Sequence, residues 1–200
     1  MRDNLASLSQ RPAVWRPAAA SWHAHVNALQ VAPTMQDWLT NRASLTARLV
    51  ARCGQFRVQK LEQSTALCLA DEYAAIALPR RSKVHQREVL LRCDGEAMVY
   101  AHTVVSLQAS ATQWPLFSTL GERSLGSTLF NDPQVVRGAL SYARLRASHP
   151  LLRRVRAVYP LAPSCLSLPA RRSLFWRKGS CLLVTELFLP GILQLGASGV

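Results

Sequence analysis

Residues 87–106 read REVLLRCDGEAMVYAHTVVS, and they carry the clearest structural signal in the chain. Two runs of mainly apolar and β-branched residues lie on either side of Asp94-Gly95. This dipeptide is typical of a two-residue hairpin turn, because both central positions of that turn need a positive φ angle. We therefore expect two antiparallel strands joined at Asp94-Gly95.

A second hairpin is predicted near the end of the sequence. Residues 171–190 read RRSLFWRKGSCLLVTELFLP, with Lys178-Gly179 at or near the expected turn. The alternating residues 55–63 predict a further strand, and residues 134–145 predict another. Hairpins with helices to one side favour an α+β fold.

The remaining segments predict helices and irregular structure. Apolar residues recur at helical spacing from Thr34 to Cys53 and predict one helix, while glycines punctuate residues 115–131 and predict short helical turns. Residues 1–33 are expected to form an N-terminal arm. Four prolines and several arginines in residues 146–170 indicate an irregular basic loop.

The composition is that of a folded and strongly basic protein. Lys and Arg outnumber Asp and Glu by 24 to 11, the formal net charge is +13, and 49% of residues are hydrophobic. A length of 200 residues suits a single domain, here residues 1–200. The charge attracts anionic small molecules, nucleic acid or acidic membranes, and it does not choose among them.

Several classes of function lack their sequence signals. The five cysteines form no C-x-x-C pair, so neither a disulfide framework nor a zinc site is expected. The chain has no nucleophile elbow, Walker loop, dinucleotide-binding fingerprint or H-E-x-x-H motif. No segment predicts a signal peptide or an integral membrane span, so we expect a cytoplasmic protein.

Glu186 raises a chemical question. It lies in LLVTELFLP, residues 182–190, the most hydrophobic part of the chain, and a buried carboxylate without a partner costs several kcal/mol. One interpretation is an edge carboxylate paired with a surface arginine. The other is a ligand site, for which Arg87, at the start of a predicted strand, is a candidate cation.

Three segments together resemble one known family. REVLLRCDGEAMVYAHTVV, LGERSLGSTLF and RRSLFWRKGSCLLVTELFLP are similar, in this order, to segments of chorismate pyruvate-lyase, the bacterial enzyme that makes 4-hydroxybenzoate for ubiquinone. DWLTNRASLTARL resembles the family's N-terminal helix, so the resemblance covers residues 35–190. It implies a six-stranded antiparallel sheet with helices packed on it, a ligand enclosed beneath helical flaps, slow product release and no cofactor.

The resemblance also implies a set of site residues. The family's carboxylate-binding arginine falls on Arg87, and the carboxylate that meets the product hydroxyl falls on Glu186. A leucine that contacts the ligand through its backbone falls on Leu125, and a position that is usually Met falls on Leu45. The implied reaction converts chorismate to 4-hydroxybenzoate and pyruvate, with no metal and no nucleic acid, and we expect a monomer. The segment 146–170 looks longer than in the family.

Two other functions are open at this point. Effector-binding domains of some bacterial transcription regulators share the lyase-like fold and bind small molecules without catalysis. Those regulators normally carry an N-terminal winged DNA-binding domain, whereas only about 34 residues precede the first predicted helix here. The other alternative is a basic RNA- or DNA-binding protein that uses the arginines of 153–156 and 171–177, with Trp176 or Phe175 for stacking.

Overall fold

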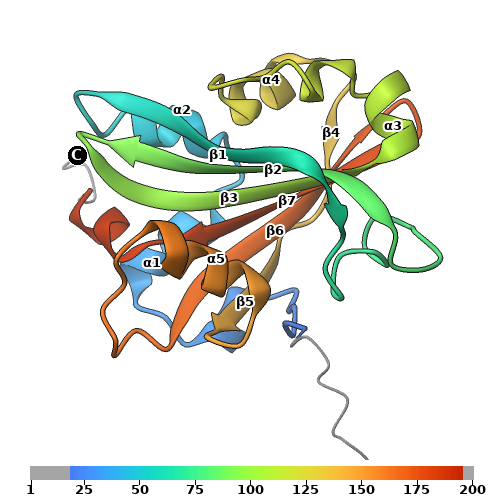
Figure 1. Cartoon of the computed structure of the whole chain (residues 1–200). Helices are drawn as coiled ribbons and strands as arrows, with labels where there is room; N and C mark the ends of the chain where they lie inside the picture. Colours follow the sequence, from blue (N-terminus) through green and yellow to red (C-terminus); the bar gives the residue numbers. More distant parts are fainter. Residues whose placement is uncertain (1–18, 196–200) are drawn as a thin grey trace, which may run out of the picture.

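The framework of the protein is one twisted antiparallel sheet. The structure is a computed structural model that describes residues 19–195. Seven strands are arranged in the order β1-β2-β3-β7-β6-β4, and β5 pairs with another part of β6 (Figure 1). They are β1 (Phe56–Leu67), β2 (Lys83–Cys93), β3 (Glu96–Ser106), β4 (Val136–Arg137), β5 (Ser141–Arg146), β6 (Ser167–Arg177) and β7 (Ser180–Phe188). The predicted α+β fold is confirmed, with seven strands instead of about six.

Short helices pack on this sheet. The α-helices are α1 (Pro33–Thr40), α2 (Leu45–Val50), α3 (Leu107–Thr112), α4 (Leu125–Asn131) and α5 (Pro150–Val158). The 3₁₀ helices within residues 19–195 are η1 (Val26–Leu29), η2 (Pro115–Phe117) and η3 (Pro190–Gln194). The short helical turns expected within residues 115–131 are therefore confirmed as η2 and α4.

Both predicted hairpins are confirmed at the predicted turns. Asp94 and Gly95 connect β2 to β3 with φ angles of 51° and 84°. Lys178 and Gly179 connect β6 to β7 with φ angles of 49° and 74°. Because β3 pairs with β7, the two hairpins lie side by side and form the centre of the sheet.

The single helix predicted from Thr34 to Cys53 is wrong, because two helices occupy this stretch. Asn41 Oδ1 accepts a hydrogen bond of 2.9 Å from Ala43 N, and Ser44 Oγ caps α2 by accepting from Ala47 N. Such local side-chain bonds compete with helix continuation and favour a break. The break turns α2 away from α1, which brings Leu45 to the sheet.

Two further predictions need correction. The strand expected over residues 134–145 is divided into β4 and β5 by residues 138–140. The irregular loop expected over residues 146–170 is wrong for its central part, which is helix α5. Pro150 occupies the first helical position, where proline is favoured, and His149 Nδ1 accepts from Leu151 N as the cap.

The predicted N-terminal arm is described only from residue 19, and residues 1–18 of it lie outside the described part. In the described part, His23 and Tyr142 exchange two backbone hydrogen bonds of 2.8 Å. The arm therefore continues the pairing of the sheet beyond β5.

Each face of the sheet carries two apolar clusters separated by charged residues. On one face, α1 and α2 cover one end, while α3, η2 and α4 cover the other. On the opposite face, α5 covers one end and the segment 68–82 covers the other. The middle of each face is consequently the place where polar side chains enter the interior.

On the face below α5, the central polar group is His102. It is buried between two carboxylates, with Nε2 3.1 Å from Glu72 Oε1 and Nδ1 3.4 Å from Glu88 Oε1. Glu88 also pairs with Arg154 of α5. Burial by itself lowers the pKa of His102, but Glu72 and Glu88 outweigh it and raise this pKa to about 9. This network fastens α5 and the segment 68–82 to the back of the sheet.

The raised pKa of His102 predicts a pH-dependent stability. Between pH 6.5 and pH 9 the folded protein holds a proton that the unfolded chain releases, so the stabilisation is complete below this range and is lost through it. The free energy of unfolding should fall by on the order of 3 kcal/mol across the range. Urea denaturation at several pH values measures this, and His102→Gln should give a nearly flat profile. An equally steep fall in that variant would contradict the assignment.

Candidate active site

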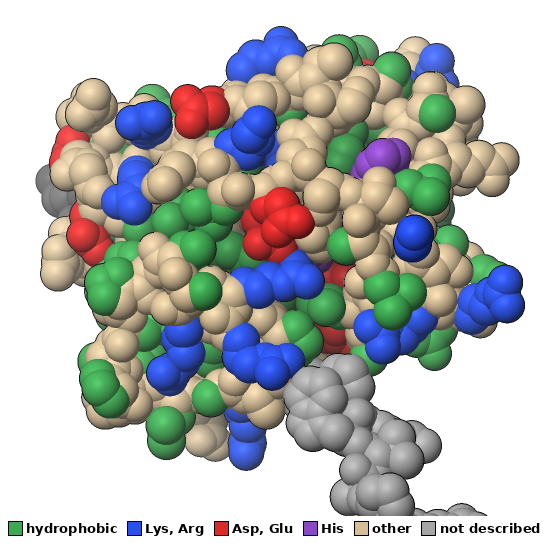
Figure 2. All heavy atoms as spheres, viewed as in Figure 1, with side chains coloured by type: hydrophobic (Ala, Val, Ile, Leu, Met, Phe, Trp, Pro, Cys, Tyr) green, Lys and Arg blue, Asp and Glu red, His purple; other side chains and the backbone are tan. Residues whose placement is uncertain are grey.

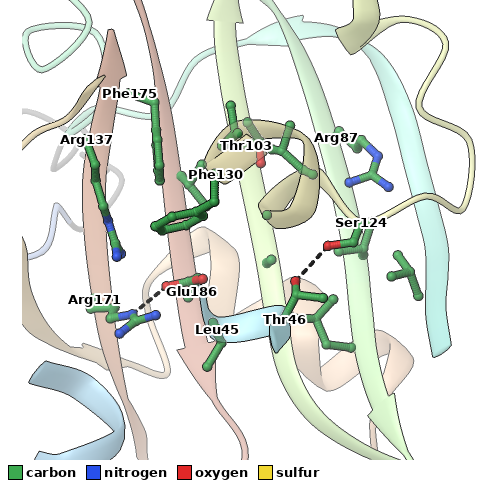
Figure 3. A pocket seen from close by; sticks show the side chains of 18 residues that line it. Leu45, Thr46, Arg87, Thr103, Ser124, Phe130, Arg137, Arg171, Phe175 and Glu186 are labelled. Carbon is green, nitrogen blue, oxygen red and sulfur yellow. Dashed lines mark hydrogen bonds and ion pairs between the residues drawn. The ribbon is translucent and has the colours of Figure 1, made fainter. Parts of the chain in front are cut away.

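A cavity lies in the middle of the other face, between the apolar clusters under α2 and α4. The volume inside it that the centre of a water molecule can reach is about 50 Å³. On the same measure, one water molecule needs roughly 10–15 Å³. Side chains from β1, β2, β3, β4, β6 and β7 form its floor and walls, and α2 and α4 contribute the cover. Figure 3 shows Arg87 on one side, with Glu186, Arg171 and Arg137 on the other.

Arg87 is a buried cation that no described carboxylate neutralises. It lies inside β2 and not at the strand start expected from the sequence, and only 2% of its surface is exposed. Its Nη2 donates to the carbonyl oxygens of Gly121 and Arg123 at 3.0 and 2.9 Å, while Nε has no partner in the described part of the chain. Burial lowers its pKa to about 10, so it is charged at neutral pH.

Glu186 is held by an arginine on the neighbouring strand. Arg171 is paired with Glu186 across β6 and β7, and its Nε lies 2.5 Å from Glu186 Oε2. The Arg171 side chain is 1% exposed and that of Glu186 is 14% exposed. The partner is therefore a buried arginine, and the interpretation of an edge carboxylate with a surface arginine is wrong.

Arg171 also connects the sheet to the end of α1. Its Nη1 donates to three backbone oxygens, at 3.2 Å from Trp38, 3.2 Å from Leu39 and 2.8 Å from Asn41. These carbonyls belong to the last turn of α1 and to the residue after it, where the final carbonyls of a helix have no intrahelical partners. One guanidinium thus fixes both the carboxylate of the cavity and the helix beside it.

Arg137 approaches the cavity from β4. Its Nε donates to Ser173 Oγ at 3.0 Å, and Nη1 donates to Arg42 O at 2.9 Å. The guanidinium carbon lies 5.5 and 5.4 Å from the ring centres of Phe130 and Phe175. Burial lowers the pKa of Arg137 to about 10, which again leaves it charged at neutral pH.

A hydrogen bond joins the two parts of the cavity cover, α2 and the start of α4. Thr46 Oγ1 and Ser124 Oγ are 2.7 Å apart, and Ser124 also caps α4 (Figure 3). A Cβ atom on Gly126 would lie 2.8 Å from Thr46 Oγ1, so glycine allows the two helices to approach this closely. Leu45 and Leu125, the first residues of their helices, line the cavity beneath this contact.

The structure brings the four predicted site residues, Arg87, Leu125, Glu186 and Leu45, to the same cavity. Sequence reasoning missed the two other arginines. Arg171 could have been found, because counting back from the Lys178-Gly179 turn places it opposite Glu186. Arg137 had no such signal, since β4 has only two residues and joins the sheet through a loop.

The sequence matches the model of the chorismate lyase family over residues 16–195. The chain belongs to the chorismate lyase family. A relative from Cupriavidus metallidurans, described as a probable chorismate pyruvate-lyase, is 45% identical over 89% of this chain and 84% of its own length. A relative from Nitrosospira multiformis with the same description is 39% identical over 96% of this chain and 99% of its own length.

Solved structures with a similar fold come from transcription regulators. A GntR-family regulator from Bacillus cereus matches 74% of this chain and 100% of its own with a TM-score of 0.53 and 10% identity. PhnF from Mycobacterium smegmatis matches 76% of this chain and 65% of its own with a TM-score of 0.53 and 14% identity. At these identities the likeness concerns the fold alone.

Other features of the described residues bear on chemistry and location. Within residues 19–195 there is no cluster of three or more His, Cys, Asp or Glu side chains suited to a metal ion. All five cysteines are free thiols. No helix in the same range has the length and apolar character needed to cross a membrane.

Removing Arg171 should destabilise the fold strongly. Arg171→Met leaves Glu186 without its partner and three carbonyl oxygens of α1 without their donor, so the free energy of unfolding should fall by about 3–5 kcal/mol. The double variant Arg171→Met/Glu186→Leu should recover part of this loss, because it also removes the unpaired carboxylate. Chemical denaturation measures both. A loss below about 1 kcal/mol in the single variant would contradict the structural role.

Proposed function

We propose that this chain is a chorismate pyruvate-lyase, which converts chorismate to 4-hydroxybenzoate and pyruvate and so supplies ubiquinone synthesis. The observation that carries this proposal is the cavity with Arg87 at one side and the Arg171-held Glu186 at the other. Membership of the chorismate lyase family places the chain among lyase enzymes. The names of its relatives support this particular reaction.

Arg87 binds the ring carboxylate of the substrate. A guanidinium and a carboxylate form two parallel charge-assisted hydrogen bonds, which fix the plane and direction of the ring. The excess of Arg and Lys over the whole chain attracts this dianionic substrate from solution.

Glu186 accepts a hydrogen bond from the ring hydroxyl. β2 and β7 are two strand spacings apart, about 10 Å, so Arg87 and Glu186 can contact opposite ends of one ring. Arg171 donates to Glu186 Oε2, and Glu186 Oε1 makes no hydrogen bond to a described residue. One carboxylate oxygen is thus anchored and the other is available to the ligand.

The chemistry needs orientation more than a strong catalyst. The ether bond to the enolpyruvyl group breaks, and its electron pair leaves with the enolpyruvyl oxygen. The hydrogen on the ring carbon that bears the hydroxyl is removed, and the ring becomes aromatic. Holding the substrate in a reactive geometry away from water can contribute on the order of 7–11 kcal/mol. The hydrogen can pass directly to the methylene carbon of the enolpyruvyl group, which gives pyruvate in one step. Alternatively Glu186 takes it as a proton and returns it to the methylene carbon of the departing enolpyruvate, so that pyruvate forms and Glu186 is ionised again.

The arginines of residues 171–177 give the rival nucleic-acid hypothesis no support. Arg171 is buried, Arg172 donates to Asp71 O and stacks on Trp22, and Arg177 pairs with Asp132. On the face seen in Figure 2, Lys and Arg side chains are spread over the surface and do not form one stripe. A dispersed charge of this kind suits the attraction of a small anion.

Purified protein incubated with chorismate should release equal amounts of 4-hydroxybenzoate and pyruvate. Arg87→Ala should lose most of this turnover, because the ring carboxylate loses its only proposed cation. Glu186→Ala should weaken 4-hydroxybenzoate binding, measured by calorimetry. Arg92→Ala is the matched control, since Arg92 also lies on β2 but bonds Gln59 and Gly95 outside the cavity. The site assignment would be rejected if Arg87→Ala kept the turnover of the control and Glu186→Ala kept its affinity for 4-hydroxybenzoate.

Loosening the cover should speed product release. Gly126→Ala forces Thr46 away from Ser124, and Thr46→Val removes the same hydrogen bond without added bulk. We expect each to raise the dissociation rate of 4-hydroxybenzoate by about tenfold, the effect of roughly one lost hydrogen bond. Competition stopped-flow measures the rate, with Ser127→Ala on the exposed side of α4 as the control. Unchanged rates in the first two variants would show that this contact does not hold the cover.

A further inference from the structure

The charged side chains that line the cavity leave an excess of positive charge. Three arginines and one glutamate line it, so its charged side chains sum to +2. Arg171 and Glu186 pair with each other. Arg87 and Arg137, at opposite sides of the cavity, form no direct ion pair with a carboxylate of the described residues, although the charge of Glu186 acts on Arg137 at longer range (Figure 3). A ligand with two separated negative charges would match this arrangement, whereas a monoanion would leave one arginine unmatched.

Arg137 is fixed in place but has a donor to spare. Ser173 Oγ and Arg42 O accept from its Nε and Nη1, and the rings of Phe130 and Phe175 hold its guanidinium from the side. Its Nη2 makes no hydrogen bond within the described residues. A preorganised guanidinium of this kind binds a carboxylate without a large further loss of side-chain entropy.

The strand register and the direction of the Arg137 side chain together place its guanidinium near Glu186. Arg137 lies opposite Phe175 on β6, four residues along this strand from Arg171, which lies opposite Glu186. The Arg137 side chain extends along the strand toward Glu186 (Figure 3), so its guanidinium is near the end of the cavity where the ring hydroxyl is proposed to bind. In chorismate the enolpyruvyl ether is attached to the ring carbon next to the one that bears this hydroxyl.

We propose that Arg137 binds the carboxylate of the enolpyruvyl group and thereby selects the dianionic substrate over the monoanionic aromatic product. This inference rests on the proposed lyase function. Arg171 does not take this role, because its Nε is engaged by Glu186 and its Nη1 by three carbonyl oxygens. Arg87 does not take it either, because it binds the ring carboxylate on the other side.

Arg137 contacts the enolpyruvyl carboxylate in the substrate complex, and it loses this contact when the reaction is complete. When the ether bond breaks, the second carboxylate leaves with pyruvate, and 4-hydroxybenzoate retains only the carboxylate at Arg87. Binding energy at Arg137 consequently favours the substrate without strengthening the hold on the aromatic product. For an enzyme whose product is enclosed under a cover, this separation limits product inhibition.

The test compares the effect of Arg137 on substrate and on product. Arg137→Met should lower kcat/KM for chorismate by at least about 30-fold, as expected for a lost charge-assisted hydrogen bond pair. The Kd of 4-hydroxybenzoate should change by less than about threefold, since the product has no group at Arg137. Arg137→Lys, which keeps the charge, should recover part of kcat/KM. Parallel losses for substrate and product would assign Arg137 a merely structural role and overturn the proposal.

A stable dianion makes the test independent of turnover. 3-(Carboxymethoxy)-4-hydroxybenzoate carries a second carboxylate on an ether beside the hydroxyl, as chorismate does. The wild-type protein should bind it more tightly than Arg137→Met or Arg137→Gln does, whereas all three should bind 4-hydroxybenzoate alike, which also shows that the variants are folded. Arg144→Met, on β5 and outside the cavity, is the control. If every folded variant keeps the wild-type affinity for the dianion, the proposal fails.

The two proposals can fail separately. A wild-type protein that binds both aromatic acids but does not convert chorismate would refute the lyase function. The preference for the dianion would in that case still decide whether Arg137 is a carboxylate site. A wild-type protein that converts chorismate with Arg137→Met unimpaired would refute the inference about Arg137 and leave the lyase function intact.

Discussion

The ion pair between Arg171 and Glu186 is the interaction on which the candidate site depends. It places a carboxylate within an apolar strand at an acceptable cost, because the partner is a guanidinium on the adjacent strand whose other hydrogen bonds all go to backbone oxygens. The same guanidinium holds the end of α1. The geometry of the cavity wall and the position of the neighbouring helix are therefore set by one side chain.

The two faces of the sheet share one arrangement of apolar and charged side chains but differ in the balance of charge. Each has apolar clusters at its ends and charged groups in the middle. Below α5 the charges compensate one another, since His102 and Arg154 neutralise Glu72 and Glu88. On the cavity face they do not, because three arginines face one glutamate, and Arg87 and Arg137 form no direct ion pair within residues 19–195. Internal compensation stabilises a packed layer, whereas uncompensated charge provides a place for an anionic ligand.

The same fold occurs in transcription regulators at identities of 10% and 14%. A sheet of long hairpins with short covering helices can hold a small molecule for binding alone or for reaction, so the fold does not decide between these uses. What distinguishes this chain is the set of groups that point into its cavity. An arginine at each side and a tethered carboxylate suit a ligand with two acids and a hydroxyl.

The sequence by itself determined the two hairpins, the α+β class and the family, because turn dipeptides and strand alternation are local signals. It also allowed four residues of the site to be named through the family resemblance. Other features came only from the tertiary structure. The break between α1 and α2 depends on side-chain caps at Asn41 and Ser44, and α5 depends on a proline that begins a helix instead of ending one. The burial of Arg87 and the approach of Arg137 depend on pairings between strands far apart in the chain, and no local pattern encodes those distances.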